Sequence, residues 1–331
     1  MTSKTGVLVI GVGSIGERHA RCFQSTDRAN VSICEVNDTL RKEVAARYGL
    51  EAAYAGWQAA LDSDFEAAVI CTPAHLHIPM AIELAGRGKH LLIEKPLSTS
   101  LDHVEELRTA IATTQVHAMV AYVMRGHPGF QALKAALDSG RFGKPVHATC
   151  NTGQHFPTYR PAYREIYYKD RATGGGAIQD GLTHMINTAE WLLGPIDRVA
   201  ADCAHQVLED VEVEDTVNVI ARHADILGSY TLNQHQARNE STFTIVCERG
   251  TIRFEMHRQR WRWVTEPETP WTDEAIGTLE RDDLFVDQAT SFLDVVRGTA
   301  LPPCTLDEAV QTLRVNLAIL AATEDERWVE V

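Results

Sequence analysis

Short apolar runs alternate with helical patterns along the first third of the chain. The apolar runs have the length of buried strands and lie at 7–10, 31–35, 67–71, 90–94 and 116–122. Helical spacing of apolar residues is found at 15–23, 40–48, 75–87 and 101–113, and a further short strand is expected around 51–54. Strands that alternate with helices predict parallel βαβ units with right-handed crossovers. We therefore expect an α/β fold that opens with a doubly wound parallel sheet of the Rossmann type.

After about residue 122 the pattern changes to a meander of strand-length runs. These runs lie at 144–154, 199–206, 215–223, 227–235, 242–248, 251–256 and 261–265. Helical patterns occupy 128–137, 175–193, 284–297 and 306–323. Such a meander predicts an α+β domain with a large, open, mainly antiparallel sheet. We expect one domain at 1–122 and a second, for substrate binding and oligomerisation, at 123–331, whose terminal helices can pack back on the first.

Composition excludes several classes of function. The chain has 331 residues with 31 basic and 45 acidic side chains, a net charge of −14, which disfavours nucleic acid and anionic membranes as partners. No apolar run has the length of a membrane span, and the first six residues lead directly into a strand, so we expect no secretory signal. The seven cysteines are scattered and predict reduced thiols in the cytoplasm.

A glycine-rich loop follows the first strand and opens the first helix. It contains Gly11, Gly13, Ser14, Ile15 and Gly16. The first glycine permits a tight turn, the second lets the backbone approach a pyrophosphate, and the third lets helix and strand pack closely. The amides at the helix N-terminus then face the phosphates. A turn without a ligand is the alternative interpretation.

Glu35 ends the second strand, nineteen residues after Gly16. A carboxylate there accepts hydrogen bonds from the ribose hydroxyls and repels a 2′-phosphate, so NAD is predicted in preference to NADP. Arg41, six residues further, could soften this preference. The alternative is a solvated surface glutamate.

Glu94-Lys95-Pro96 carries a recognisable signature. With Gly11–Gly16 and the stretch Cys71-Thr72-Pro73-Ala74-His75-Leu76-His77, it resembles the Gfo/Idh/MocA family of glucose–fructose oxidoreductases, inositol dehydrogenases and their relatives. The run of residues 174–180, followed by His184, Trp191 and Gly194, extends the resemblance over essentially the whole chain. The resemblance implies a Rossmann domain joined to an α+β domain, no metal, and dimers or tetramers. It also implies hydride transfer between nicotinamide and a sugar, an inositol or a related cyclic compound.

The resemblance also implies a set of site residues. Lys95 follows a buried strand at the carboxyl edge of the sheet, where open α/β sheets bind ligands, and its ammonium can stabilise a developing alkoxide. His184 exchanges the substrate proton, and Asp180 lies close to it, four residues earlier on one helical face. From spacing alone, Lys95 could be a surface charge and His184 a core histidine satisfied by Asp180.

Further candidates surround this set. Thr72 and Pro73 follow a strand and are expected at the cofactor, together with His77 and Glu94. Tyr163, Arg164 and Tyr167 precede a run of three glycines and are candidate substrate contacts, because tyrosine stacks on sugars and arginine grips anions. Ordinary packing of a surface helix is the alternative. Cys71, His75 and His77 could suggest zinc, but no further ligand is evident, so no metal is expected.

We therefore expect an NAD-dependent oxidoreductase that acts on a secondary hydroxyl or ketone of a sugar, inositol or sugar derivative. Two alternatives stay open: an NADP-linked reductase of another cyclic carbonyl or diol, and a dinucleotide-binding regulator without turnover. A homodimer or homotetramer is expected through the C-terminal sheet. Arg258, Arg260 and Arg262 alternate there with Trp261 and Trp263, which favours slightly an aromatic subunit interface over packing within the chain.

Overall fold

The computed structural model describes residues 4–50 and 52–331. Two parts of the sequence predictions lie outside the described residues. They are residues 1–3 of the stretch expected to lead into the first strand, and position 51 of the expected third strand. The chain forms two compact units, the first from residues up to 123 together with 279–310, the second from 124–278 together with 311–331. Helix α9 (Leu306–Asp325) begins in the first unit and ends in the second.

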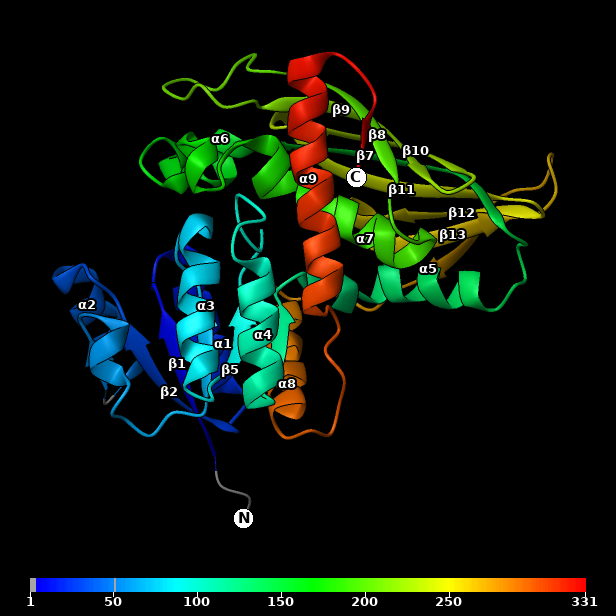
Figure 1. The fold of residues 1–331 in the computed structure, drawn as a ribbon. Coiled ribbons are helices and arrows are strands. Elements are labelled where there is room, and N and C mark those ends of the chain that lie inside the picture. Colours follow the sequence, from blue (N-terminus) through cyan, green and yellow to red (C-terminus); the bar gives the residue numbers. More distant parts are fainter. Residues whose placement is uncertain (1–3, 51) are drawn as a thin grey trace. The chain divides into compact units, whose positions relative to one another are not determined.

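The first unit contains a six-stranded parallel sheet (Figure 1). Its strands are β1 (Thr5–Ile10), β2 (Ala29–Cys34), β3 (Ala53–Tyr54), β4 (Ala67–Ile70), β5 (His90–Ile93) and β6 (Ala118–Val120). They lie in the order β3-β2-β1-β4-β5-β6, so the direction of winding reverses between β1 and β4. This order is that of dinucleotide-binding sheets, which bind their ligand outside the carboxyl ends of the strands at the reversal. The predicted doubly wound sheet is confirmed.

Helices cover both faces of this sheet. One face packs on α1 (Ser14–Ser25), α2 (Asp38–Tyr48) and α8 (Asp283–Val296). The other packs on α3 (His77–Gly86), which lies beside α4 (Val104–Thr114) in Figure 1. Because both faces are covered, consecutive strand residues such as Val7, Leu8 and Val9 are all buried. This explains the continuous apolar runs in the sequence.

Helix α8 comes from far along the chain and joins the first unit through α1. The rings of Phe23 and Phe292 meet edge to face, with centroids 6.0 Å apart. Arg21 forms a bidentate pair with Asp282, at 2.6 and 2.8 Å. A buried phenylalanine contributes about 3–5 kcal/mol against its alanine variant, so the apolar contact dominates this docking and the partly exposed ion pair aligns it.

The second unit contains a nine-stranded mixed sheet. Its strands are β7 (Pro145–His155), β8 (Arg198–Ala204), β9 (Thr216–His223), β10 (Ile226–Asn233), β11 (His235–Cys247), β12 (Gly250–Glu255), β13 (Arg260–Val264), β14 (Thr272–Ala275) and β15 (Val329–Glu330). They lie in the order β14-β13-β12-β11-β7-β10-β9-β8-β15, and every neighbouring pair is antiparallel except β7 with β10. The predicted large, mainly antiparallel sheet is confirmed, with β14 and β15 added at its edges.

One face of this sheet is covered by α5 (Pro128–Asp138), α7 (Thr183–Leu193) and residues 311–325 of α9 (Figure 1). Strand residues alternate accordingly: Val217, Val219 and Ala221 are buried, whereas Ile220 between them is 53% exposed. Trp261 and Trp263 also face the covered side and pack against the core. Their rings therefore pack within the unit, and Arg260 and Arg262 alternate with them on the other face of β13. Arg258 does not belong to this alternation, because it ends a short 3-10 turn (Met256–Arg258) before the strand. No described helix is long and apolar enough to cross a membrane.

Candidate active site

The glycine-rich loop has the shape that a pyrophosphate requires. Gly11 has a positive φ of 83°, which favours glycine. A Cβ at Gly16 would lie 1.8 Å from the carbonyl oxygen of Gly11, so only glycine allows the helix to approach the strand. A Cβ at Gly13 would meet no atom within 4 Å. Exposed Gly13 and Ser14 begin α1, so the backbone there is open to an anionic ligand.

Glu35 lies at the end of β2 with its carboxylate turned toward this loop. Its Oε2 accepts a hydrogen bond from the amide of Val12 at 3.0 Å, and its Oε1 accepts one from the amide of Asn37 at 2.9 Å. Arg41 donates to the carbonyl oxygen of Glu35 at 2.7 Å. The loop and the acid that the motif pairs in sequence are therefore in contact. Together they fit the pyrophosphate and ribose of a dinucleotide.

Lys95 follows β5 at the same edge of the sheet as the glycine loop. The backbone bonds Cys71 N→Ile10 O and Glu94 N→Ile70 O, both about 3 Å long, join the ends of β1, β4 and β5. The carboxyl ends of these strands therefore carry Gly11, Thr72 and Lys95 side by side. The Lys95–Pro96 peptide bond is cis. Lys95 is partly exposed, and the residues that flank it are buried.

Buried polar contacts hold both ends of the Lys95–Pro96 turn. Glu94 accepts a contact from His19 Nε2 at 2.7 Å and a hydrogen bond from the amide of Lys95 at 2.9 Å. His77 contacts the carbonyl oxygens of Pro96 at 3.0 Å and of Thr72 at 2.7 Å. Burial lowers the pKa of His77, and a neutral imidazole donates only one hydrogen, so one of these two contacts carries the proton at neutral pH. His77 thus lies behind the turn.

Asp180 and His184 lie in the second unit, on a continuous helical segment. The predicted helix over 175–193 begins as a π-helix, η7 (Ala177–Leu182), and continues as α7. A π-helical turn holds one more residue than an α-helical turn, and such turns are frequent at functional sites. Gly181 allows this segment to approach strand β10, because a Cβ there would lie 2.7 Å from Leu232. Asp180 and His184 are both partly exposed.

Tyr167 contacts Asp180 directly. Its hydroxyl donates to Asp180 Oδ1 at 2.7 Å, and its side chain is 39% exposed. Tyr163, by contrast, is 1% exposed and donates to the carbonyl oxygen of Glu209 at 3.1 Å. Arg164 forms ion pairs with Glu209 and Asp210, at 2.9 and 3.2 Å. The structure therefore brings Tyr167 to Asp180 and directs Tyr163 and Arg164 to the segment around 209.

Two residues outside this helix support its start, and the sequence patterns did not predict either of them. Glu214 is buried and accepts a hydrogen bond from the amide of Ile178 at 3.0 Å, while Arg171 pairs with it at 2.8 Å. A Cβ at Gly176, where φ is 89°, would lie 2.4 Å from Glu214. Gly176 therefore makes room for a carboxylate that caps the helix start. His19 was missed as well, although a polar residue on the apolar face of α1 was a visible signal.

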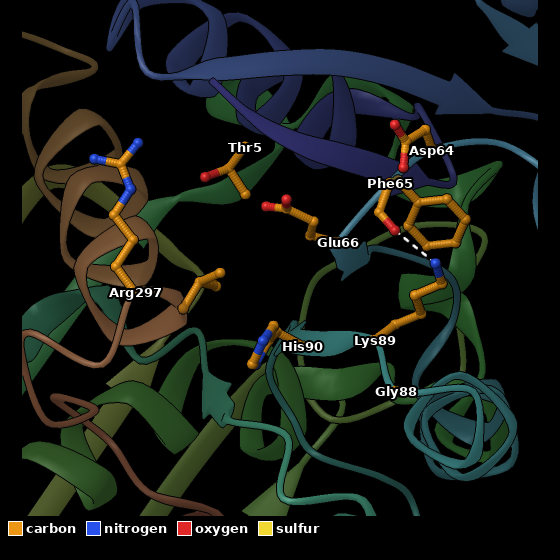
Figure 2. Close-up of a pocket in the computed structure, with 9 residues that line it drawn as sticks. Thr5, Asp64, Phe65, Glu66, Gly88, Lys89, His90 and Arg297 are labelled. Carbon is orange, nitrogen blue, oxygen red and sulfur yellow. Dashed lines mark hydrogen bonds between the residues drawn. The ribbon is translucent and has the colours of Figure 1, made fainter. Parts of the chain in front are cut away.

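A pocket of about 560 Å³ lies at the opposite edge of the parallel sheet. Figure 2 shows its lining, which includes Thr5 at the start of β1, Glu66 just before β4, and His90 at the start of β5. Lys89 donates to the carbonyl oxygen of Phe65 at 2.6 Å and lies over the ring. These are amino ends of strands, so this pocket is separate from the glycine loop and Lys95. Cofactor binding therefore does not involve it.

The described residues contain no cluster of three or more His, Cys, Asp or Glu side chains arranged to hold a metal ion. Cys71 is partly exposed and lies beside Glu94; burial of its sulfur and this carboxylate raise the pKa of the thiol well above its ordinary value. His77 is occupied with backbone carbonyls. A zinc ligand set built on Cys71 and His77 therefore has no support in this part of the chain.

The parallel sheet, the glycine loop and Glu35 define a dinucleotide-binding protein. Two family models match the chain: the oxidoreductase family with NAD-binding Rossmann fold over residues 5–122, and the GFO/IDH/MocA C-terminal domain over residues 130–253. The chain belongs to the Gfo/Idh/MocA family of oxidoreductases, and its first unit binds NAD. The family assignment, the fold class and the NAD cofactor expected from the sequence are confirmed.

Known proteins resemble the chain over nearly its whole length or over about two thirds of it. Levoglucosan dehydrogenase of Pseudarthrobacter phenanthrenivorans is 25% identical over 98% of this chain and 97% of its own length. Inositol 2-dehydrogenase of Rhizobium meliloti is 29% identical over 68% of this chain and 66% of its own. The solved structure of levoglucosan dehydrogenase with NADH and levoglucosan has a TM-score of 0.90 at 23% identity, covering 99% of this chain and all of that one. At this identity the structural likeness establishes the fold.

Proposed function

We propose that the protein transfers a hydride between nicotinamide and a secondary hydroxyl or ketone of a sugar, an inositol or a sugar derivative. The observation that carries the proposal is the position of Lys95. It follows β5 at the sheet edge that also carries the glycine loop, and its turn is held by Glu94 and His77. The sugar and inositol dehydrogenases among the relatives support this substrate class.

Residues of the first unit would hold the cofactor. The backbone at Gly13, Ser14 and Ile15 faces the pyrophosphate, and Glu35 accepts hydrogen bonds from the ribose. The loops at Thr72–Pro73 and Glu94–Lys95 lie at the same edge, with His77 behind them, and would hold the nicotinamide end of the cofactor. Bound NAD supplies the hydride acceptor. Lys95 donates a hydrogen bond to the reacting oxygen and stabilises its negative charge.

Residues of the second unit would handle the substrate and its proton. His184 takes the hydroxyl proton during oxidation and returns it during reduction, as an imidazole does near neutral pH. Asp180 accepts a hydrogen bond from a neighbouring hydroxyl, while Tyr167, whose single hydroxyl hydrogen goes to Asp180 at 2.7 Å, orients that carboxylate. Tyr163 and Arg164, which were also predicted as substrate contacts, support the segment that carries Tyr167. The proposal requires Lys95 and His184 to meet the same substrate.

A direct assay tests this function. Purified protein is incubated with NAD and a panel of sugars, inositols and sugar acids, and reduction of the cofactor is followed by its absorbance. Lys95→Ala should lower kcat by about 1,000-fold with little change in NADH affinity, because the ammonium lies away from the pyrophosphate loop. Lys89→Ala, at the other end of β5, is the matched control and should retain activity. Comparable turnover in Lys95→Ala would remove this lysine from the mechanism.

The same assay distinguishes the alternatives. Tight NADH binding without turnover of any panel member would favour a dinucleotide-binding regulator. Stronger binding of NADPH than NADH, followed by reduction of a cyclic carbonyl, would favour an NADP-linked reductase. A crystal structure with NADH and a polyol would show whether Lys95, Asp180 and His184 contact one ligand.

We also propose a cytoplasmic homodimer or homotetramer that associates through the uncovered face of the nine-stranded sheet. Ile220 and Leu227 are 53% and 44% exposed on that face, on adjacent strands. Exposed aliphatic residues on a flat sheet favour association. Light scattering should report an oligomer that Ile220→Glu dissociates. The scattered cysteines support a reducing compartment.

A further inference from the structure

His19 lies on the face of α1 that packs on the sheet, one turn after the glycine loop. Gly16, His19, Ala20 and Phe23 form the buried stripe of this helix. An imidazole on an apolar stripe requires a polar partner, because an unpaired buried donor costs stability. Its Nε2 lies 2.7 Å from Glu94 Oε1, and both side chains are at most 6% exposed.

Two aromatic rings fix the orientation of the imidazole. The ring of Phe285 meets His19 edge to face at 5.5 Å, and Phe23 lies at 6.4 Å. Phe285 comes from α8, which reaches α1 through Arg21 and Asp282. Packing of these rings therefore holds the imidazole so that its Nε2 donor faces Glu94.

Glu94 transmits this constraint to the turn that carries Lys95. While Oε1 contacts His19, the other carboxylate oxygen accepts the amide of Lys95 at 2.9 Å. Burial by itself raises the pKa of Glu94, but the hydrogen bond from His19 and the nearby Lys95 charge outweigh it and hold the pKa below its ordinary value. The carboxylate is therefore ionised and accepts from both sides.

We infer that His19 is a positioning residue for Lys95, acting through Glu94. His19 links two parts of the proposed site. One is helix α1, whose N-terminus would bind the pyrophosphate, and the other is the backbone of Lys95, whose amine would contact the reacting oxygen. The inference rests on the proposed function for the role of Lys95. Removing the Nε2 donor lets the Glu94 carboxylate rotate and frees the amide of Lys95. A displacement of about 1 Å at a reacting group costs about 100-fold in rate.

The first test uses the protein without cofactor or substrate. Selective ¹⁵N-lysine labelling reports the amide of Lys95, and the amide of Lys89, which donates to the Leu84 carbonyl at 3.0 Å, is the internal control. His19→Leu should accelerate hydrogen exchange of the Lys95 amide about tenfold or more and leave Lys89 unchanged. His19→Gln, whose amide nitrogen reaches the position of Nε2, should restore protection. Unchanged exchange at Lys95 in His19→Leu overturns the inference.

The second test uses turnover with the substrate that the panel identifies. His19→Leu should lower kcat about 100-fold with KM and NADH affinity changed less than about threefold, and His19→Gln should recover most of it. Phe292→Leu, which alters the packing of α8 on α1 at Phe23 and leaves His19, Phe285 and Glu94 in place, should stay close to the parent protein. Equal losses in Phe292→Leu and His19→Leu, with no rescue by glutamine, would show a packing role and overturn the inference.

A double variant tests the route through Glu94. In Glu94→Ala both the contact with His19 and the hydrogen bond from the Lys95 amide are absent, so His19→Leu in that background should add less than about threefold to the loss. Additive losses would mean that His19 acts by another route. Should leucine at 19 prevent folding, His19→Asn, whose shorter amide does not reach Glu94, takes its place. If no substrate is found, the exchange experiment still decides the inference, so its failure is distinguishable from failure of the proposed function.

Discussion

The hydroxyl of Tyr167 donates a 2.7 Å hydrogen bond to Oδ1 of Asp180. The tyrosine comes from an irregular segment with several short helical turns, and the aspartate from the π-helical start of the segment that also carries His184. This pair therefore links the segment before the glycine run to the proposed proton-transfer helix. Because both groups are partly exposed, a ligand hydroxyl can reach them.

Tyr167→Phe should raise KM for the polyol about tenfold while kcat falls less, because a hydrogen bond to a charged partner contributes about 1.5–3 kcal/mol. Steady-state kinetics at saturating NAD measures both constants. Tyr159→Phe is the matched control, since Tyr159 is 54% exposed in the same segment. Equal effects of the two variants would contradict a specific role for Tyr167.

The glycine loop offers a paired substitution. Gly13→Ala should fold normally, because its Cβ meets no protein atom, yet weaken NADH binding about 100-fold by blocking the pyrophosphate. Gly16→Ala should destabilise the first unit as well, because its Cβ would lie 1.8 Å from a carbonyl oxygen. Cofactor titration and thermal unfolding separate the two effects. Normal NADH affinity in Gly13→Ala would mean that the pyrophosphate binds elsewhere.

Glu35 should set the preference for NADH. We expect NADPH to bind about 100-fold more weakly, because a 2′-phosphate would meet the Glu35 carboxylate, which already accepts from Val12 and Asn37. Glu35→Gln should reduce the ratio of the NADH and NADPH affinities at least about tenfold, mainly by strengthening NADPH binding. Asp38→Asn, a neighbouring acidic position on α2, is the control. Equal affinities of the parent protein for the two cofactors would overturn the assignment.

Glu190 should make stability depend on pH. Burial on α7 raises the pKa of this carboxyl from 4.5 to about 7, against donors from Thr312, Ile196 and Gln311 and the charge of Arg125. A raised pKa means that the folded state binds the proton more tightly. The free energy of unfolding therefore falls as the pH rises from about 4.5 to 7, by roughly 3 kcal/mol in total.

Urea unfolding at pH 5 and pH 8 tests this dependence. Glu190→Gln stays neutral throughout, so its stability relative to the parent protein should rise by roughly 3 kcal/mol between these pH values. Glu268→Gln, an exposed carboxyl, should show little such change. A constant difference between Glu190→Gln and the parent protein would show that Glu190 stays ionised in the folded state.

Local patterns were enough to predict much of this molecule. The strand–glycine loop–helix order and the acid at the end of β2 follow from short-range backbone constraints, because only glycine tolerates φ of 83° at Gly11 and the close approach at Gly16. The period of apolar residues likewise separates a sheet covered on both faces from one covered on a single face. Lys95 at a strand end follows from the same reasoning.

Contacts between distant segments were decided only by the tertiary structure. Packing of Phe292 on Phe23 assigns α8 to the first unit, a placement that the sequence left open as one that the terminal helices can adopt. The partner of His19 lies 75 residues away, and that of Tyr167 depends on how an irregular segment folds back. Trp261 and Trp263 are a further example. Their alternation with arginines in the sequence separates the two faces of the strand, but it does not tell which face the helices cover. Periodicity encodes which residues share a face, whereas the identity of the opposing surface depends on the complete chain.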